Sequence, residues 1–227
     1  MITINNKDLS IFGISKYIKF SIETSKYNNQ GSYWSEGSLK PIKGKKNETY
    51  RSLSTKFIFK GKNREQIYKN ISKFIEESKE CVFKRDSLMY EVELSCNKEP
   101  EILNPNMCFL EIGFNLLDIY ENEKSISTTA SAKININSPK PCYANLELNA
   151  STAVISCTIN INDVEIVVKN IKENETIFIG SGKVIAGGKS KINDVDIWEF
   201  PKLKPGINNI SINRKDVSLT VKYCERW

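Results

Sequence analysis

The end of the chain alternates apolar and polar residues, and this pattern constrains the fold most. From Val217 to Tyr223 every second residue is apolar or aromatic, and between Ile207 and Ile212 isoleucines are interspersed with polar residues. Side chains at this spacing lie on one face of a strand. Pro205-Gly206 precedes the first segment and is typical of a tight turn, because Pro fixes φ and Gly tolerates positive φ. We therefore expect the chain to end in strands of an antiparallel sheet.

The same pattern extends back through the second part of the chain. Strands are predicted at 143–149, 154–161, 164–168, 176–179, 183–186 and 195–200. Short strands at such regular spacing are typical of an antiparallel sandwich or jelly roll. Gly182 to Ser190 superficially resembles a phosphate-binding loop, but its spacing is one residue too long and strands flank it. We expect a hairpin with a Gly187-Gly188 turn there instead.

The first part of the chain mixes strands with one helix. Strands are expected at 2–4, 17–22, 52–60, 82–83, 89–94 and 107–120. The segment 64–79 carries Ile67, Ile71, Phe74 and Ile75 at helical spacing, which predicts one amphipathic helix. Asn63 is a suitable N-cap for it, with Gln66 three residues on. A sheet with one packed helix is an α+β layout.

A change of composition separates the two parts. Residues 125–132 are small and polar, and Pro139 and Pro141 then interrupt the chain. We place the boundary between an N-terminal domain, 1–137, and a C-terminal domain, 138–227. The predicted fold class is mainly β with one principal helix: an α+β domain followed by an antiparallel β-sandwich.

Composition excludes several classes of function. The chain has no histidine, so nucleophile systems that need a histidine base are absent, and so is the commonest zinc ligand. Its six cysteines form no C-x-x-C pair, and we expect free thiols rather than a disulfide framework. No apolar run approaches the length of a membrane helix, and the net charge of +6 is not concentrated in one part. We therefore predict no enzyme activity, no cofactor, no metal, no membrane contact and no specific nucleic-acid binding.

Two groups of residues are candidate sites. Trp34, Tyr50 and Arg51 lie beside a basic segment, 40–46, which is read as a solvated loop, a protein contact or a nucleic-acid surface. Trp198 and Phe200 have equal parity, so we expect both on one side of a strand. They are core residues if that side faces inward and a stacking platform for sugar if it faces outward.

The C-terminal string also resembles a known family. Phe200-Pro-x-Leu-x-Pro-Gly-x-Asn-x-Ile-x-Ile212, followed by Tyr223-x-x-x-Trp227, is similar to the end of distal tail proteins of long-tailed bacteriophages. The order of a short first strand, the Tyr50-Arg51 strand, one helix and a long apolar strand at 107–120 extends the resemblance over the whole chain.

The resemblance implies a structural virion protein rather than an enzyme. It implies a hexameric ring at the tail tip, assembled in the host cytoplasm, and a galectin-like or carbohydrate-module-like second domain. The implied partners are further copies of the chain, the major tail (tube) protein, the tape-measure protein, a tail-associated hub protein and a receptor-binding protein. The chain lacks the histidine of true galectins. The alternative function is a monomeric carbohydrate-binding module or adhesin for bacterial surface glycan.

Overall fold

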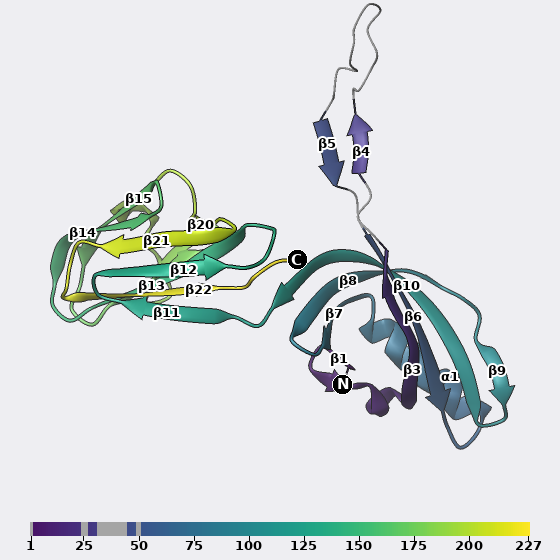
Figure 1. The fold of residues 1–227 in the computed structure, drawn as a ribbon. Helices are drawn as coiled ribbons and strands as arrows, with labels where there is room; N and C mark the ends of the chain where they lie inside the picture. Colours follow the sequence, from purple (N-terminus) through teal and green to yellow (C-terminus); the bar gives the residue numbers. More distant parts are fainter. Residues whose placement is uncertain (1, 24–26, 31–44, 49–50) are drawn as a thin grey trace, which may run out of the picture. The chain divides into compact units, whose positions relative to one another are not determined.

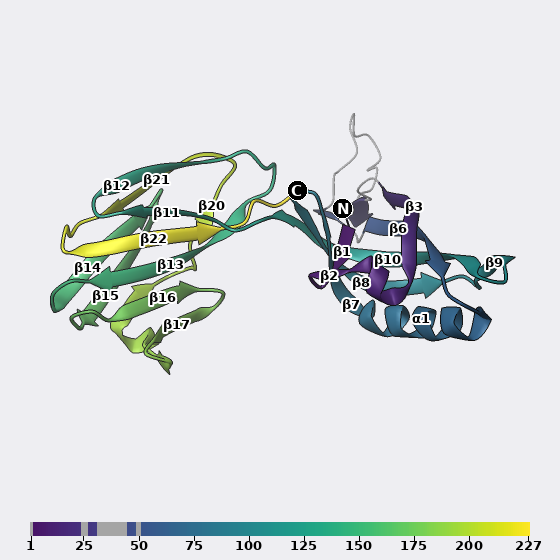
Figure 2. The ribbon, with the colours of Figure 1, turned by 90° about the horizontal axis from the view of Figure 1, so that it is seen from below.

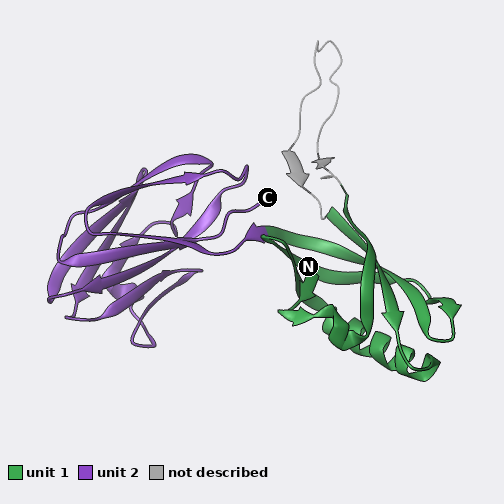
Figure 3. Cartoon of the chain, turned by 60° about the horizontal axis from the view of Figure 1, so that its bottom comes forward, with its two compact units in different colours: residues 1–119 green, residues 120–227 purple. Residues whose placement is uncertain are grey.

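The computed structural model describes residues 2–23, 27–30, 45–48 and 51–227 (Figure 1). The chain divides into two compact units, residues 1–119 and 120–227 (Figure 3). This division precedes the expected boundary at 137/138. The reason is that β11 (Lys124–Thr128) and β12 (Ser131–Ile136) pair with the last two strands of the second unit. Their small polar residues look like a linker in the sequence but form strands.

The first unit is an antiparallel sheet with one α-helix. Its strand order is β2-β1-β7-β8-β10-β6-β3, with β9 pairing the beginning of β10. The strands are β1 (Ile2–Ile4), β2 (Lys7–Asp8), β3 (Ile14–Ile22), β6 (Arg51–Lys60), β7 (Glu80–Arg85), β8 (Leu88–Asn97), β9 (Glu101–Asn104) and β10 (Met107–Glu121). A 3-10 helix spans Leu9–Phe12, and β4 (Tyr27–Gln30) pairs with β5 (Lys45–Glu48) as a separate two-stranded sheet.

Helix α1 (Arg64–Glu77) covers one face of this sheet (Figure 2). The predicted N-cap is confirmed, because the Asn63 side chain accepts a hydrogen bond of 2.9 Å from the backbone N–H of Gln66. The predicted apolar stripe is buried at Ile67, Ile71 and Phe74. The helix ends at Glu77, slightly earlier than expected, where buried Ser78 turns its hydroxyl back to the carbonyl of Phe74 at 2.6 Å.

The first core is built around aromatic rings. Phe74 of α1 meets Phe12, Phe57 and Phe59 edge-on, with ring centroids 5.5, 5.2 and 5.7 Å away. Edge-to-face rings add specific attraction to their large buried area. This contact fixes the helix on the sheet, because Phe57 and Phe59 both lie on β6 and are fully buried.

The second unit contains two antiparallel sheets around one apolar core. One has the order β11-β22-β13-β16-β17-β18, with β20 pairing β13, and the other has β12-β21-β14-β15-β19. The remaining strands are β13 (Cys142–Ala150), β14 (Val154–Ile161), β15 (Val164–Ile171), β16 (Thr176–Gly180), β17 (Lys183–Ala186), β18 (Lys189–Ser190), β19 (Val195–Ile197), β20 (Lys202–Leu203), β21 (Gly206–Ile212) and β22 (Val217–Tyr223). A short 3-10 helix spans Ile192–Asp194.

The alternation seen in the sequence builds this core. Leu146 and Leu148 on β13 lie opposite Val221 and Leu219 on β22, and all four side chains are fully buried. They pack in one cluster with residues of the other sheet, such as Ile159. The chain is thus mainly β, with antiparallel sheets and one α-helix within its described part.

Two predicted turns are present. Gly187 and Gly188 join β17 to β18 with φ of 54° and 76°, as a two-residue hairpin requires. Gly206 has φ of 89°, and the turn that contains it is held by a fully buried side chain, Asn208. Asn208 accepts a bond from the Lys204 N–H at 2.8 Å and donates to the carbonyls of Lys204 and Gly206 at 2.7 and 3.0 Å.

Candidate interaction surfaces and the C-terminal polar centre

Polar groups and exposed aromatic side chains are the candidates for a functional site in this chain. The sequence has no histidine, and the described residues contain no cluster of cysteine, aspartate and glutamate suited to a metal ion. Within the same residues, we find no helix with the length and hydropathy of a membrane span.

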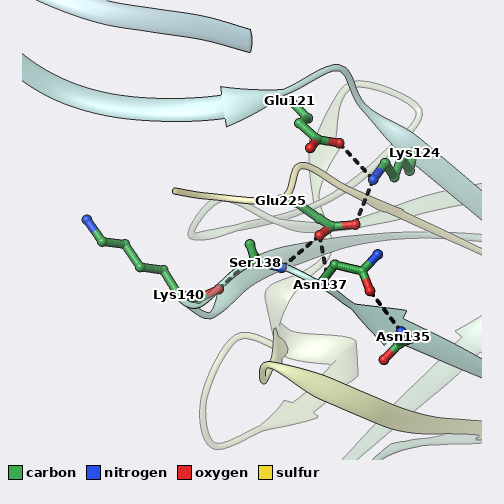
Figure 4. Close-up of polar contacts among 7 residues, drawn as sticks. All are labelled: Glu121, Lys124, Asn135, Asn137, Ser138, Lys140 and Glu225. Carbon is green, nitrogen blue, oxygen red and sulfur yellow. Dashed lines mark hydrogen bonds and ion pairs between the residues drawn. The ribbon is translucent and has the colours of Figure 1, made fainter. Parts of the chain in front are cut away.

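A network of hydrogen bonds and ion pairs surrounds Glu225 in the second unit (Figure 4). Its side chain is almost fully buried. One carboxylate oxygen accepts from Lys124 Nζ at 2.6 Å, and the other accepts from the backbone N–H groups of Asn137 and Ser138, each at 2.9 Å. Glu121 holds the same ammonium group at 2.8 Å. We call these five residues the C-terminal polar centre.

The electrostatics of this centre favour its charged state. Burial raises the pKa of Glu225, but the hydrogen bonds from Lys124, Asn137 and Ser138 outweigh burial and leave that pKa below its ordinary value. The pKa of Lys124 is raised by its hydrogen bonds to Glu121 and Glu225. A buried carboxylate with three donors is therefore ionised at neutral pH.

The centre joins three separate segments of the second unit. The backbone N–H of Glu121 donates to the carbonyl of Glu225 at 3.0 Å, and Arg226 forms isolated bridges with Tyr120 and Lys140. The chain end is thereby tied to the first residues of the unit and to the turn at 138–140. Sequence reasoning missed this group. Its only local signal is one acidic residue, Glu225, within an otherwise aromatic and basic ending.

Of the first predicted group, Trp34, Tyr50 and Arg51, the structure describes Arg51. Trp34 and Tyr50 lie outside the described residues. Arg51 begins β6, is half-buried and pairs in register with Leu116 of β10. Arg51 belongs to the first unit, whereas Trp198 and Phe200 belong to the second unit.

The structure separates Trp198 from Phe200. The expectation that Trp198 and Phe200 face the same side is wrong, and the core alternative does not hold for Trp198, whose side chain is 98% exposed. Phe200 is partly buried against the core of the second unit. The reason is that β19 ends at Ile197, so the strand parity that linked the two residues no longer applies beyond it.

The sheet of the first unit ends in an irregular strand. Strand β3 forms one edge, and its pairing with β6 shifts register after Ile14 and again after Tyr17. Such bulges, together with exposed lysines such as Lys16 and Lys19, discourage unspecific pairing at a sheet edge. Ile18 on this strand is nevertheless 50% exposed. Strand β3 is thus a candidate contact surface.

Comparison with solved structures identifies the architecture. The chain is similar to the crystal structure of the SPP1 Dit protein, with a TM-score of 0.75 and 12% sequence identity. The alignment covers 100% of this chain and 99% of that one. The chain has the fold of the SPP1 Dit protein. That protein is described as a paradigm of the hub adsorption apparatus in phages that infect Gram-positive bacteria.

Chains of the phage P2 baseplate are also similar to this one. In the activated baseplate with Ca, the TM-score is 0.56 at 11% identity, covering 95% of this chain and 92% of that chain. The same baseplate with Sr gives 0.56 and 11%, with 92% and 90% covered. No family model and no curated protein matches the sequence. The resemblance to distal tail proteins noted in the sequence is therefore confirmed at the level of the fold.

Proposed function

We propose that this chain is a structural component at the distal end of a long-tailed phage tail. In this role it forms a ring, with six copies as the expected number, that links the tail tube to the baseplate hub and the host-recognition proteins. In this role the chain catalyses no reaction. Assembly takes place in the host cytoplasm, where its thiols remain reduced.

One observation carries the proposal: the likeness to the SPP1 Dit protein extends over both units and essentially the full length of both chains. A single shared sandwich would be weak evidence, because such folds serve many functions. Two different units in the same order, one with a sheet and helix and one with two packed sheets, are a far more specific combination.

The proposal assigns different tasks to the two units. The first is the ring-forming unit, which would contact the tube and tape-measure proteins. Closed rings arise from heterologous contacts whose rotation closes. We propose Trp34, Tyr50 and Arg51, together with the edge strand β3, as contributors to the contact. The second unit is galectin-like and contacts the hub and receptor-binding proteins.

The test is the oligomeric state of the purified chain. Light scattering after size exclusion is expected to give about six times the chain mass of 25.9 kDa, and negative-stain images are expected to show rings. Trp34→Ala and Arg51→Glu are expected to reduce the mass toward one chain, while the matched change Arg64→Glu on the helix leaves it unchanged. Rings that persist in both interface variants would remove those residues from the contact.

A monomeric carbohydrate-binding protein is the second candidate, and the exposed Trp198 is the observation that favours it. A monomer at all concentrations that is retained by bacterial polysaccharide would replace the ring proposal. A monomer that assembles only when mixed with tail-tube or hub proteins would retain the structural role and remove the unaided ring.

A further inference from the structure

The second unit contains a pocket of about 390 Å³ at the edge where the chain end leaves β22. Its volume falls within the range of roughly 300–1,000 Å³ that small-molecule sites occupy. Tyr143, Phe200 and Tyr223 contribute three aromatic side chains to its wall. Tyr143 lies on β13, Tyr223 on β22 and Phe200 between β19 and β20. These segments are far apart in the sequence, so no single motif contains the three residues.

The aromatic walls differ in exposure. Tyr143 is 50% exposed, whereas Phe200 and Tyr223 are partly buried and pack against the core. Aromatic side chains that pack against the core lose little conformational freedom when a ligand binds, and an exposed aromatic side chain offers apolar area to the ligand. The pocket therefore presents flat apolar surfaces that are already in place.

A polar pair lies beside these rings. Asn145 accepts a hydrogen bond from the Ser181 hydroxyl at 3.3 Å, and its amide nitrogen has no hydrogen-bond partner within the described part of the chain. Gly180 makes room for Asn145, since a Cβ there would come within 2.2 Å of the Asn145 Oδ1. Ser181 itself has φ of 49°, a conformation that non-glycine residues rarely adopt.

The charges that line the pocket are balanced. Glu123 supplies one carboxylate and Arg226 one guanidinium, which lies 5.7 Å from the centre of the Tyr143 ring. Lys202 lies 5.4 Å from the same ring and is 3.9 Å from Glu199. A ligand with a net charge would meet attraction and repulsion together, whereas a neutral ligand rich in hydroxyl groups finds donors and acceptors of both kinds.

We propose that this pocket binds one sugar ring of a neutral glycan. An apolar ring face would lie on Tyr143, and hydroxyl groups would bond to Asn145, Ser181 and Glu123. The inference rests on the second unit alone and does not depend on the proposed ring. It assigns no part to Trp198, because that residue is not in the pocket wall.

The C-terminal polar centre positions one wall of this pocket. Cys224 and Arg226 line the pocket, while Glu225 between them bonds to Lys124, Asn137 and Ser138. Glu225 is therefore a positioning residue, and it holds the chain end in the conformation that places its neighbours at the pocket.

Saturation-transfer NMR on the full chain tests the proposal, with glucose, galactose, N-acetylglucosamine and, as a charged comparison, glucuronic acid. Transfer to at least one neutral sugar is expected. Tyr143→Ala and the isosteric Asn145→Asp are each expected to weaken binding about tenfold, as the loss of one stacking or hydrogen-bond contact implies. Ile155→Ala removes another exposed side chain of the second unit that lies outside the pocket wall, and it is the matched control. Trp198→Ala removes the alternative candidate platform and is expected to leave binding at this pocket intact.

Several results would overturn the proposal. These are transfer to none of the neutral sugars, transfer to glucuronic acid alone, or binding that only Trp198→Ala weakens. Asn145→Asp keeps the shape of the side chain, so it decides the matter if Tyr143→Ala unfolds. Light scattering on the same samples reports the oligomeric state separately. A chain that forms no oligomeric ring but still binds sugar would leave this inference standing.

Discussion

Glu225 and Lys124 form an ion pair of 2.6 Å between the chain end and the first strand of the second unit, 101 positions apart in sequence. Glu225 is almost completely buried, whereas the Lys124 side chain is 40% exposed. The carboxylate thus depends on its donors more than the ammonium depends on the carboxylate. This asymmetry makes Glu225 the more sensitive position of the two.

Glu225→Gln is expected to destabilise the second unit by about 2 kcal/mol, because a neutral amide leaves buried donors poorly satisfied. Glu121→Gln is the matched control. It removes the other partner of the same lysine. Both of these side chains keep contact with solvent, so the effect is expected to stay below about 1 kcal/mol. Urea unfolding followed by tryptophan fluorescence measures both. Equal effects would show that Glu225 is not the centre of this group.

The pH dependence of stability follows from the lowered pKa of Glu225. A group with a lowered folded-state pKa contributes stability above its unfolded pKa, about 4.3 for Glu, and loses it as pH falls through the folded value. The stability difference between the unaltered chain and Glu225→Gln is therefore expected to be full at pH 7 and to shrink below about pH 4.3. Unfolding curves from pH 7 to pH 3 provide the test. A constant difference over this range would mean that the charge of Glu225 does not stabilise the fold.

Local patterns in the sequence predicted most of the regular elements. Strand β14 spans the predicted residues 154–161, and Asn63 caps the helix as expected. These features depend on neighbours in sequence, namely strict alternation and a side chain that bonds three residues on. Among the segments that were missed, β11 and β12 are rich in Ser, Thr and Asn, and their strand state depends on pairing with β22 and β21.

The sites were less predictable than the strands. Trp198 was placed by extending strand parity past Ile197, where the strand ends. The partners of Glu225 lie 101, 88 and 87 positions away, so no local pattern reports them. The Asn in the Pro-Gly-x-Asn string was visible as part of a resemblance, but its buried hydrogen bonds were not.

Asn208→Ala is expected to destabilise the second unit by about 2–3 kcal/mol, because the Lys204 N–H and two carbonyls lose their partner inside the turn. The exposed neighbour gives a matched control, and Asn209→Ala is expected to change stability by no more than about 0.5 kcal/mol. Thermal unfolding of the two variants side by side makes the comparison. Similar melting temperatures would contradict the role given to the Asn208 side chain.

In the first unit, Phe74→Ala is expected to cost about 3–5 kcal/mol, since it opens a cavity among three rings. Tyr68→Ala on the same helix removes a side chain that is 47% exposed, and the expected loss is far smaller. Calorimetry distinguishes the units, because the transition of the second unit should stay in place in both variants. A shift of that transition with Phe74→Ala would show that the two units unfold together.

The cysteines test the packing of both units by their reactivity. All six are free thiols. Burial raises the pKa of Cys81 to about 12 and those of Cys142 and Cys157 to about 11. The thiolate is the reactive form, so these three are expected to resist iodoacetamide at pH 8 until the protein unfolds, while exposed Cys96 is alkylated in the folded state. Mass spectrometry of digested samples reads each site. If Cys157 were labelled as fast as Cys96 without denaturant, the core between the two sheets of the second unit would have to open readily, contrary to its complete burial.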